Sequence, residues 1–355
     1  MNKEAIIKRL IEKSAEIITE DEFKERLKSG DKLTHYIGFE ISGYVHIGQG
    51  IMSALIMKDL TELGVQCTVW LADWHTAIND KLDGTKETAA KIGQGYFTEA
   101  IKASYLAVGG NPDDIEFRLA SDWYKKNPMK YWEMVMRAAQ HTTDSRAKRS
   151  ITIMGREVGD EIEVAKLFYP LMQAADVLYQ EADIAHAGTD QRKAYVIMRD
   201  TAEKVAPGKP KPSVLLHNLL PGLTSPDGKM SKSDPASAIF IHDTPDEIEQ
   251  KIRKAYAAEK DAENNPVLTW AENLLFWNRE KPFIIERKEE HGGNLEMNDF
   301  ASLKTSYENG SLHPMDLKAA VSQELIKLLA PAREHFNQPE VAAKKKELDE
   351  VLANR

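Results

Sequence analysis

The sequence predicts an α/β protein with a doubly wound parallel sheet, followed by a helical C-terminal domain. Short apolar segments of strand length alternate with amphipathic segments of helix length over residues 33–219, which is typical of parallel sheets covered by helices on both faces. From about Asp234 this alternation gives way to helices with long polar connections. The chain has 355 residues, more than a single core usually holds. Two domains are therefore expected.

Each element is predicted from its local pattern. Residues 3–18 carry apolar side chains at helical spacing and predict a packed N-terminal helix. Strands are expected at residues 33–39, 65–72, 115–119, 182–187 and 213–219. Helices are expected at 47–63, 86–106 and 190–205, with a largely helical stretch over 129–172. Later helices are expected at 245–257, 268–276 and 317–329, and a charged, solvated helix from Val341 onward.

These elements divide the chain into an N-terminal helical segment over 1–30, a Rossmann-like sheet domain over 31–235 and a C-terminal helical domain over 236–355. The sheet domain carries a helical insertion around residues 125–175. Ligands of such sheets bind beyond the carboxyl ends of the strands. The segments that end in Gly38, Asp73 and Gly188 are therefore expected to converge on one pocket.

Composition excludes several classes of protein. The single cysteine, Cys67, excludes a disulfide framework or a cysteine-based zinc site. No apolar run approaches the length of a membrane span, and no basic, apolar leader occupies residues 1–20. We therefore expect a cytoplasmic protein without a membrane partner. The formal net charge is −9 at pH 7, so composition alone does not suggest a nucleic-acid partner.

Two short motifs, far apart in the sequence, predict the chemistry. His46-Ile-Gly48-Gln49 stands where a predicted strand gives way to a helix, and Lys229-Met-Ser-Lys232-Ser233 follows a turn-rich stretch. A helix start offers unpaired backbone N–H groups to phosphates, and two loop lysines can neutralise the charge of a departing pyrophosphate. Either motif alone is weak. Together they predict a site for a nucleoside triphosphate.

The two motifs resemble the HIGH and KMSKS signatures of class I aminoacyl-tRNA synthetases. Gln49 stands where a second histidine is usual, and it keeps a hydrogen-bond donor without the imidazole's charge. Further strings resemble tyrosyl-tRNA synthetases of the archaeal and eukaryotic type, from about residue 30 almost to the C-terminus. They are YIGFEISG from Tyr36, LADWH from Leu71, YPLMQAAD from Tyr169, GTDQRK from Gly188, PGL from Pro221 and LHPMDLK from Leu312.

The resemblance implies a tyrosine–tRNA ligase. Such an enzyme activates L-tyrosine with ATP to form tyrosyl-adenylate and pyrophosphate, then transfers tyrosine to the 3′-terminal ribose of tRNA(Tyr). The reaction needs positioning and charge stabilisation rather than a protein nucleophile. Mg²⁺ arrives with ATP, and no metal site of the protein's own is expected. The implied catalytic residues are His46, Gly48, Gln49, Lys229 and Lys232.

The resemblance also assigns the two substrate sites. Asp190 is expected at the ribose hydroxyls, although a helix N-cap role remains open for it. Tyr36 and Asp176 would give a phenol its donor and acceptor, and His75 is expected only to line the pocket. The implied ATP site comprises Gly38, Phe39, His46, Gly48, Asp190, Met230, Ser231 and Lys232. The implied tyrosine site comprises Tyr36, Ala72, His75, Tyr169, Gln173, Asp176 and Gln191.

Residues that contact tRNA are implied in both domains. Arg192 and Lys193 are expected near the acceptor end, and His291 and Asp316 match anticodon-reading positions. His291 stands where relatives can carry phenylalanine, and an imidazole can still stack on a base. We also expect a homodimer through the helices near residues 129–146, with one tRNA bridging both subunits.

Three alternative functions share parts of this pattern. A tryptophan–tRNA ligase of the same class would have a similar lysine motif, but the joint presence of Tyr36, Asp176 and Gln191 favours tyrosine. A nucleotidyltransferase of the same fold would normally lack the tRNA-reading C-terminal part. A catalytically silent RNA-binding relative would not need the intact motif residues His46 and Lys232.

Overall fold

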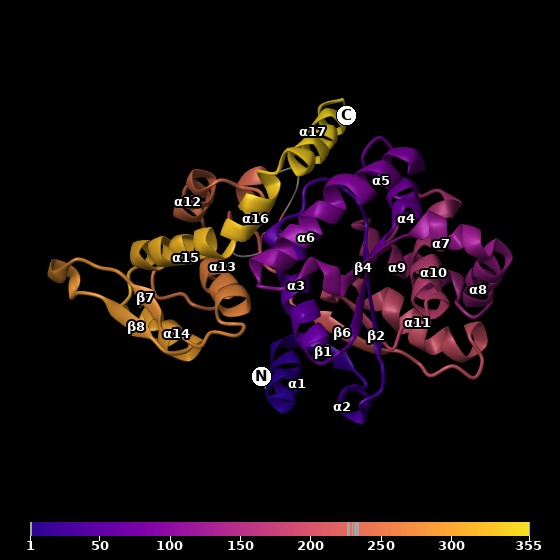
Figure 1. The fold of residues 1–355 in the computed structure, drawn as a ribbon, viewed down its shortest axis with the longest axis horizontal. Helices are drawn as coiled ribbons and strands as arrows, with labels where there is room; N and C mark the ends of the chain where they lie inside the picture. The colour runs from indigo at the N-terminus through magenta and orange to yellow at the C-terminus, as the bar shows by residue number, and fades with distance from the viewer. Residues whose placement is uncertain (1, 226–227, 229, 231–233, 355) are drawn as a thin grey trace.

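A six-stranded sheet organises the first two thirds of the protein (Figure 1). The computed structural model describes residues 2–225, 228, 230 and 234–354, without the side chain of His291. The strand order is β1-β6-β5-β2-β3-β4, and every pairing is parallel except that of β1 with β6. This topology confirms the predicted doubly wound sheet. The strands are β1 (Ser14–Ile18), β2 (Thr34–Phe39), β3 (Gln66–Leu71), β4 (Ile115–Leu119), β5 (Ile184–Gly188) and β6 (Ser213–His217).

Helices cover both faces of this sheet, as Figure 1 shows. Side chains alternate along each strand, so that Ile37 faces one core and Tyr36 faces the other. The core around Ile37 is closed by α1 (Lys3–Lys13), α3 (Ile47–Glu62) and α6 (Thr98–Ala107). The core around Tyr36 is closed by α8 (Pro128–Gln140), α10 (Val164–Tyr179) and α11 (Arg192–Val205). Shorter helices are α2 (Glu20–Ser29), α4 (Asp73–Ile78), α5 (Lys86–Ile92), α7 (Ala120–Lys126) and α9 (Asp144–Ser150).

Three predicted helices of the sheet domain differ from the structure. The N-terminal helix ends at Lys13, and residues 14–18 instead form β1, because they pair with the edge strand β6. The helix expected at 86–106 is interrupted by a π-helical turn over Gly93–Phe97, where Gly95 has non-helical backbone angles. The stretch over 129–172 divides into α8, α9 and α10. Tertiary pairing and glycine override the local helical pattern at these places.

The C-terminal part is helical, as predicted, with a short hairpin that the sequence analysis missed. Its helices are α12 (Pro245–Lys254), α13 (Pro266–Trp270), α14 (Phe300–Glu308), α15 (Pro314–Leu328), α16 (Ala330–Phe336) and α17 (Pro339–Ala353). The hairpin pairs β7 (Phe283–Ile285) with β8 (Leu295–Met297), strands too short for a clear alternation signal. The boundaries proposed at residues 30 and 235 remain predictions.

The terminal helix α17 is not a solvated tail, which corrects the prediction. Val341 and Leu348 are buried, and Lys344 Nζ lies 2.7 Å from Glu99 Oε1 on α6. Asp349 accepts a hydrogen bond from the Tyr44 hydroxyl. Figure 1 shows α17 beside α5 and α6. Separately, each helix in the described ranges is too short or too polar to cross a membrane.

Candidate active site

One cavity of about 370 Å³ opens at the carboxyl ends of the parallel strands. Its walls come from β2, the start of α3, the middle of α10, the turn after β5 and the end of β6. Every described residue predicted for catalysis, ATP or tyrosine lines this cavity. They are Tyr36, Gly38, Phe39, His46, Gly48, Gln49, Ala72, His75, Tyr169, Gln173, Asp176, Asp190, Gln191 and Met230. The predicted residues Lys229, Ser231 and Lys232 lie outside the described residues.

The two sequence motifs meet at the start of α3. His46 is the N-cap of this helix, and its Nδ1 accepts a hydrogen bond from the Gln49 backbone N–H at 3.2 Å. A Cβ on Gly48 would overlap the Met230 side chain, so glycine allows the second motif to approach the helix start. Within the described ranges, Gln49 Oε1 is a buried atom that lacks a partner. The N–H groups of Ile47, Gln49 and Gly50 already donate within the protein, so this end of the cavity offers a ligand the dipole of the helix start and the Gln49 side-chain oxygen.

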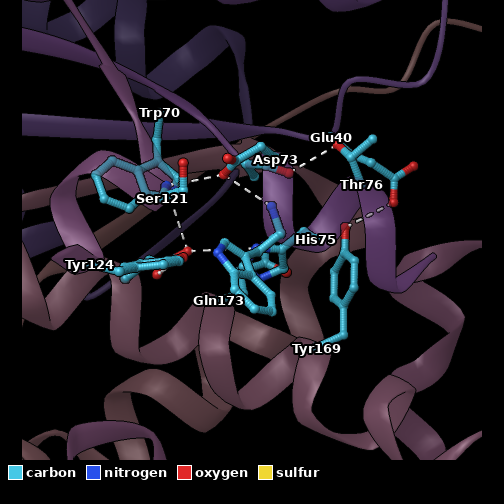
Figure 2. Close-up of polar contacts among 12 residues, drawn as sticks. Glu40, Trp70, Asp73, His75, Thr76, Ser121, Tyr124, Tyr169 and Gln173 are labelled. Carbon is cyan, nitrogen blue, oxygen red and sulfur yellow. Dashed lines mark hydrogen bonds and ion pairs between the residues drawn. The ribbon is translucent and has the colours of Figure 1, made fainter. Parts of the chain in front are cut away.

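At the opposite end, the Asp176 carboxylate is fully buried and accepts three hydrogen bonds. Trp70 Nε1 donates to Oδ2 at 3.0 Å, and the Tyr124 and Tyr131 hydroxyls donate to Oδ1 at 2.7 and 2.9 Å. Figure 2 shows the Trp70 side chain, which comes from β3, and the Tyr124 side chain, which comes from α7, on two sides of the site. Burial raises the pKa of Asp176 to about 7, although these three donors act in the opposite direction.

Trp70, Tyr124 and Tyr131 are site residues that were not predicted from the sequence. Trp70 lies two residues before Ala72 and so shares its face near the end of β3. That spacing could have identified Trp70 as a neighbour of the site. Tyr124 and Tyr131 belong to α7 and α8, and their rings stack at 3.8 Å between centroids. No local pattern connects them to Asp176, because their contact with it depends on how these helices pack.

Tyr36 completes this closed end. Gly38 lies on the same face of β2, and a Cβ there would collide with the Tyr36 hydroxyl, so glycine leaves room for the ring along the strand. Burial and the nearby Asp176 raise the pKa of Tyr36 well above its usual value. The hydroxyl therefore stays protonated and can donate a hydrogen bond.

His75 lines the wall between the two ends, as predicted. Its ring packs edge-on against Tyr169, with 4.5 Å between centroids, and its Nδ1 is 3.9 Å from Asp176 Oδ2. Burial lowers the pKa of His75 to about 4, so the imidazole is neutral at pH 7. Both ring nitrogens are buried and lack partners among the described residues.

Polar side chains surround the middle of the cavity. The Tyr169 hydroxyl donates to Glu40 Oε2 at 3.1 Å, a contact that Figure 2 shows. Gln173 Nε2 donates to Gln191 Oε1 at 3.3 Å, and Gln173 Oε1 is buried without a partner in the described part of the chain. An acceptor oxygen without a donor suits a ligand ammonium group.

The open question about Asp190 is resolved by the start of α11. The N-cap of that helix is Gln191, and it has no side-chain cap. Asp190 instead lies in a short 3₁₀ turn, where its Oδ2 accepts from Gln191 Nε2 at 2.9 Å. The N-cap role is therefore not realised, and the carboxylate remains at the cavity wall.

The four residues predicted for tRNA contact do not line the cavity. Arg192 follows directly after Gln191 and pairs with Glu16 at 2.6 Å. Lys193 Nζ donates to the Arg149 carbonyl and to Thr152 Oγ1, both at 2.9 Å. His291 ends a short 3₁₀ turn between β7 and β8, and Asp316 lies in the first turn of α15. Arg192 and Lys193 therefore directly follow the cavity-lining residue Gln191 in the chain, whereas His291 and Asp316 lie in the C-terminal part.

A doubly wound sheet with this helix-start motif, and a closed polar slot beside it, is the arrangement expected of class I aminoacyl-tRNA synthetases. The family described as tRNA synthetases class I (W and Y) matches residues 28–330. The chain is 46% identical over 344 residues to the tyrosine–tRNA ligase of Thermococcus sibiricus, covering 90% of this chain and 91% of that one. It is 42% identical over 360 residues to the same enzyme of Pyrococcus furiosus, covering 95% and 96%.

Solved structures agree with these relatives. Tyrosyl-tRNA synthetase of Pyrococcus horikoshii, complexed with L-tyrosine, superposes with a TM-score of 0.91 at 40% identity, over 98% of this chain and 100% of that one. A tryptophanyl-tRNA synthetase of Aeropyrum pernix has a TM-score of 0.66 at 20% identity, over 94% of this chain and 84% of that one, which shows the shared fold. The chain belongs to the tyrosine–tRNA ligase family of class I aminoacyl-tRNA synthetases.

Proposed function

We propose that the protein activates L-tyrosine with ATP, releases pyrophosphate, and transfers tyrosine from tyrosyl-adenylate to the 3′-terminal ribose of tRNA(Tyr). One observation carries this proposal. A buried carboxylate, Asp176, and a protonated hydroxyl, Tyr36, face the closed end of a cavity whose other end is a helix start. A phenol needs one acceptor and one donor at its oxygen, and this pair supplies both.

The same pair accounts for the choice of tyrosine over phenylalanine. The tyrosine hydroxyl donates to Asp176 and accepts from Tyr36, whereas phenylalanine leaves both buried groups without that partner. An unpaired buried polar group costs about 1–3 kcal/mol, and more when it is charged. The ammonium group lies at Tyr169, Gln173 and Gln191, and the ring lies along Ala72 and His75.

Activation takes place at the helix start. The tyrosine carboxylate attacks the α-phosphorus of ATP in line, and pyrophosphate leaves with its magnesium ion. His46, Gly48 and Gln49 bind phosphate oxygens at the helix N-terminus, and Lys229 and Lys232 neutralise the leaving group. Gly38, Phe39 and Met230 lie against the adenosine, and Asp190 binds the ribose.

The decisive experiment is ATP–pyrophosphate exchange with each of the twenty amino acids, followed by charging of matched tRNAs. Exchange is expected with tyrosine alone, and charging with tRNA(Tyr) alone. Exchange with tryptophan would favour the tryptophan enzyme. Turnover that is indifferent to tRNA would favour a nucleotidyltransferase, and no exchange with any amino acid would favour a silent relative.

Lys232→Ala is expected to slow pyrophosphate exchange about a hundredfold, since one electrostatic contact to the developing charge is lost. The tyrosine dissociation constant should stay within about twofold, because this contact forms only with the phosphates. Exchange kinetics and equilibrium dialysis with labelled tyrosine measure the two effects. Lys209→Ala, an exposed lysine paired with Glu181, is the matched control. Equal loss of both quantities in the Lys232 variant would refute the assigned role.

We further propose a homodimer through α8. Met129, Trp132 and Met136 are exposed and lie three and four residues apart on one stripe of this helix. Exposed large apolar side chains in one stripe favour a self-complementary contact. Light scattering at micromolar concentration should give the mass of a dimer, and Trp132→Glu should give that of a monomer. A monomeric mass for the unchanged protein would contradict the proposal.

In the complex with tRNA, Arg192 and Lys193 contact the acceptor end, while His291 and Asp316 read the anticodon. In this proposal, one tRNA bridges the two subunits of the dimer. The charging reaction supports protein biosynthesis in the cytoplasm.

A further inference from the structure

Three buried histidines form a row across the sheet that the activation scheme does not use. His35 of β2, His186 of β5 and His217 of β6 are 1%, 0% and 6% exposed. His35 Nε2 lies 3.1 Å from His186 Nδ1, and His186 Nε2 lies 2.9 Å from His217 Nδ1. Both contacts are within hydrogen-bonding distance. We call these residues the histidine row.

The strand register sets the direction of the histidine row. His186 pairs with Ile37, two residues after His35, and His217 pairs with Gly188, two residues after His186. Steps of two residues keep the three side chains on one face of the sheet. Each step also moves the row toward the carboxyl edge. The row therefore starts in the protein interior and ends at the active-site cavity, which His217 lines.

Burial determines how many protons the row holds. Desolvation lowers the pKa of His35 to about 3 and that of His217 to about 4, and it lowers the pKa of His186 well below the usual value. All three rings are therefore neutral near pH 7, so each has one N–H donor and one acceptor nitrogen. Two ring-to-ring hydrogen bonds then require that all three N–H groups point the same way along the row.

The inner end of the row favours one of the two directions. His35 Nδ1 is buried and lacks a partner among the described residues. If the row points inward, this atom is an unpaired N–H. If the row points toward the cavity, this atom is an unpaired acceptor. Buried acceptors lack a partner more often than buried N–H groups do, so the direction toward the cavity is favoured. The outward direction places an N–H on His217 Nε2.

That N–H lies close to Gly188, at the cavity wall that His217, Gly188 and Asp190 all line. The point where a Cβ would stand on Gly188 lies 3.5 Å from His217 Nε2, 2.6 Å from Asp190 Oδ1 and 2.8 Å from Leu219 Cδ2, so the space at Gly188 itself is filled. A donor and a carboxylate acceptor thus lie near one another at the cavity wall. A ligand hydroxyl just beyond this point can accept from the imidazole and donate to the carboxylate.

We propose that His217, held in its Nε2–H form by His186 and His35, binds a ribose hydroxyl of ATP together with Asp190. The inference rests on the proposed function, since it refines the nucleotide half of that site. His217 contacts the substrate, whereas His186 and His35 are positioning residues that select its tautomer. The consequence is a preference for ATP over a nucleotide that lacks this hydroxyl.

The first test compares ATP, 2′-deoxy-ATP and 3′-deoxy-ATP in pyrophosphate exchange. The parent protein should discriminate about tenfold against one of the deoxynucleotides, the equivalent of one hydrogen bond with a charged group nearby. His217→Leu should reduce this discrimination several-fold, because only the Asp190 contact remains, and His186→Leu should reduce it by a smaller factor, while KM for tyrosine changes less than about twofold. Ile184→Val, on the same face of β5, is the packing control and should retain the full discrimination.

The second test reads the tautomers directly in the ligand-free protein. Long-range ¹H–¹⁵N spectra of histidine-labelled protein, assigned with the single variants, should show the Nε2–H form at all three positions. Added ATP should shift the His217 Nε2 signal. An Nδ1–H form of His217, or discrimination unchanged in His217→Leu, would overturn the proposal. If the parent protein shows no exchange, the proposed function fails, while the spectra with and without ATP still decide the role of the histidine row.

Discussion

Asp176→Asn is expected to lower kcat/KM for tyrosine about a hundredfold, because hydrogen bonds to a charged acceptor contribute about 1.5–3 kcal/mol. The carboxylate accepts from Trp70 on one oxygen and from Tyr124 and Tyr131 on the other. Asparagine has one acceptor oxygen, so its NH₂ group must face one of these donor sets. The preference for tyrosine over phenylalanine should shrink by a similar factor. Pyrophosphate exchange with both amino acids measures it.

Asp73→Asn is the matched control for this variant. Asp73 is also fully buried close to the site, and its Oδ1 accepts from the backbone N–H groups of Trp74 and Ser121. Asparagine can keep both of those bonds through its own oxygen. Tyrosine kinetics should therefore change little. Undiminished tyrosine preference in Asp176→Asn would show that this carboxylate does not bind the phenol.

The pH dependence of tyrosine binding provides a second measure of the same variant. Burial raises the pKa of Asp176 to about 7 from an ordinary value of 3.8, so the group's contribution to folding stability is lost as pH rises through about 7. Tyrosine binding changes in the opposite sense, because the ionised form is the better acceptor. Affinity should weaken below pH 7 in the parent protein, and the asparagine variant should lose this dependence.

His46→Asn is expected to reduce kcat for pyrophosphate exchange about a hundredfold, through loss of one contact to the phosphates in the transition state. The imidazole has two roles, since its Nδ1 also caps α3 by accepting from the Gln49 N–H. Asparagine is a strong N-cap residue and preserves this second role. Thermal unfolding should therefore stay close to that of the parent protein, and KM for tyrosine should change little.

His46→Ala separates the two roles of the imidazole. It should slow exchange to a similar extent and also destabilise the fold by about 1 kcal/mol, because the cap is lost. Calorimetry and exchange kinetics on the three proteins distinguish the effects. If the asparagine variant is as active as the parent protein, His46 serves α3 only as a cap.

Much of the site could be predicted because its residues occur in short, ordered strings. Tyr169, Gln173 and Asp176 project from one face of α10 by their spacing alone, and Gly48 follows a strand end directly. All three α10 residues and Gly48 line the same cavity. Local spacing predicts such neighbours because helix and strand periods are constant.

Long-range contacts could not be predicted in this way. The terminal helix α17 has the composition of a solvated helix, yet Lys344 and Asp349 attach it to α6 and to Tyr44. Residues 14–18 have the sequence pattern of a continuing helix, but they form the strand β1 because they pair with β6. These outcomes depend on the partner surface, and local propensity is too weak to decide against it.

The sequence by itself determined the class of enzyme, the five parallel strands β2 to β6 with the alternation of strands and helices between them, and many of the residues that line the cavity. Only the tertiary structure decided what holds those residues. Trp70, Tyr124 and Tyr131 meet at Asp176 from three elements, and the histidine row crosses three strands. The physical reason is that buried polar groups must find hydrogen-bond partners wherever packing places them, and packing brings together residues that no local pattern connects.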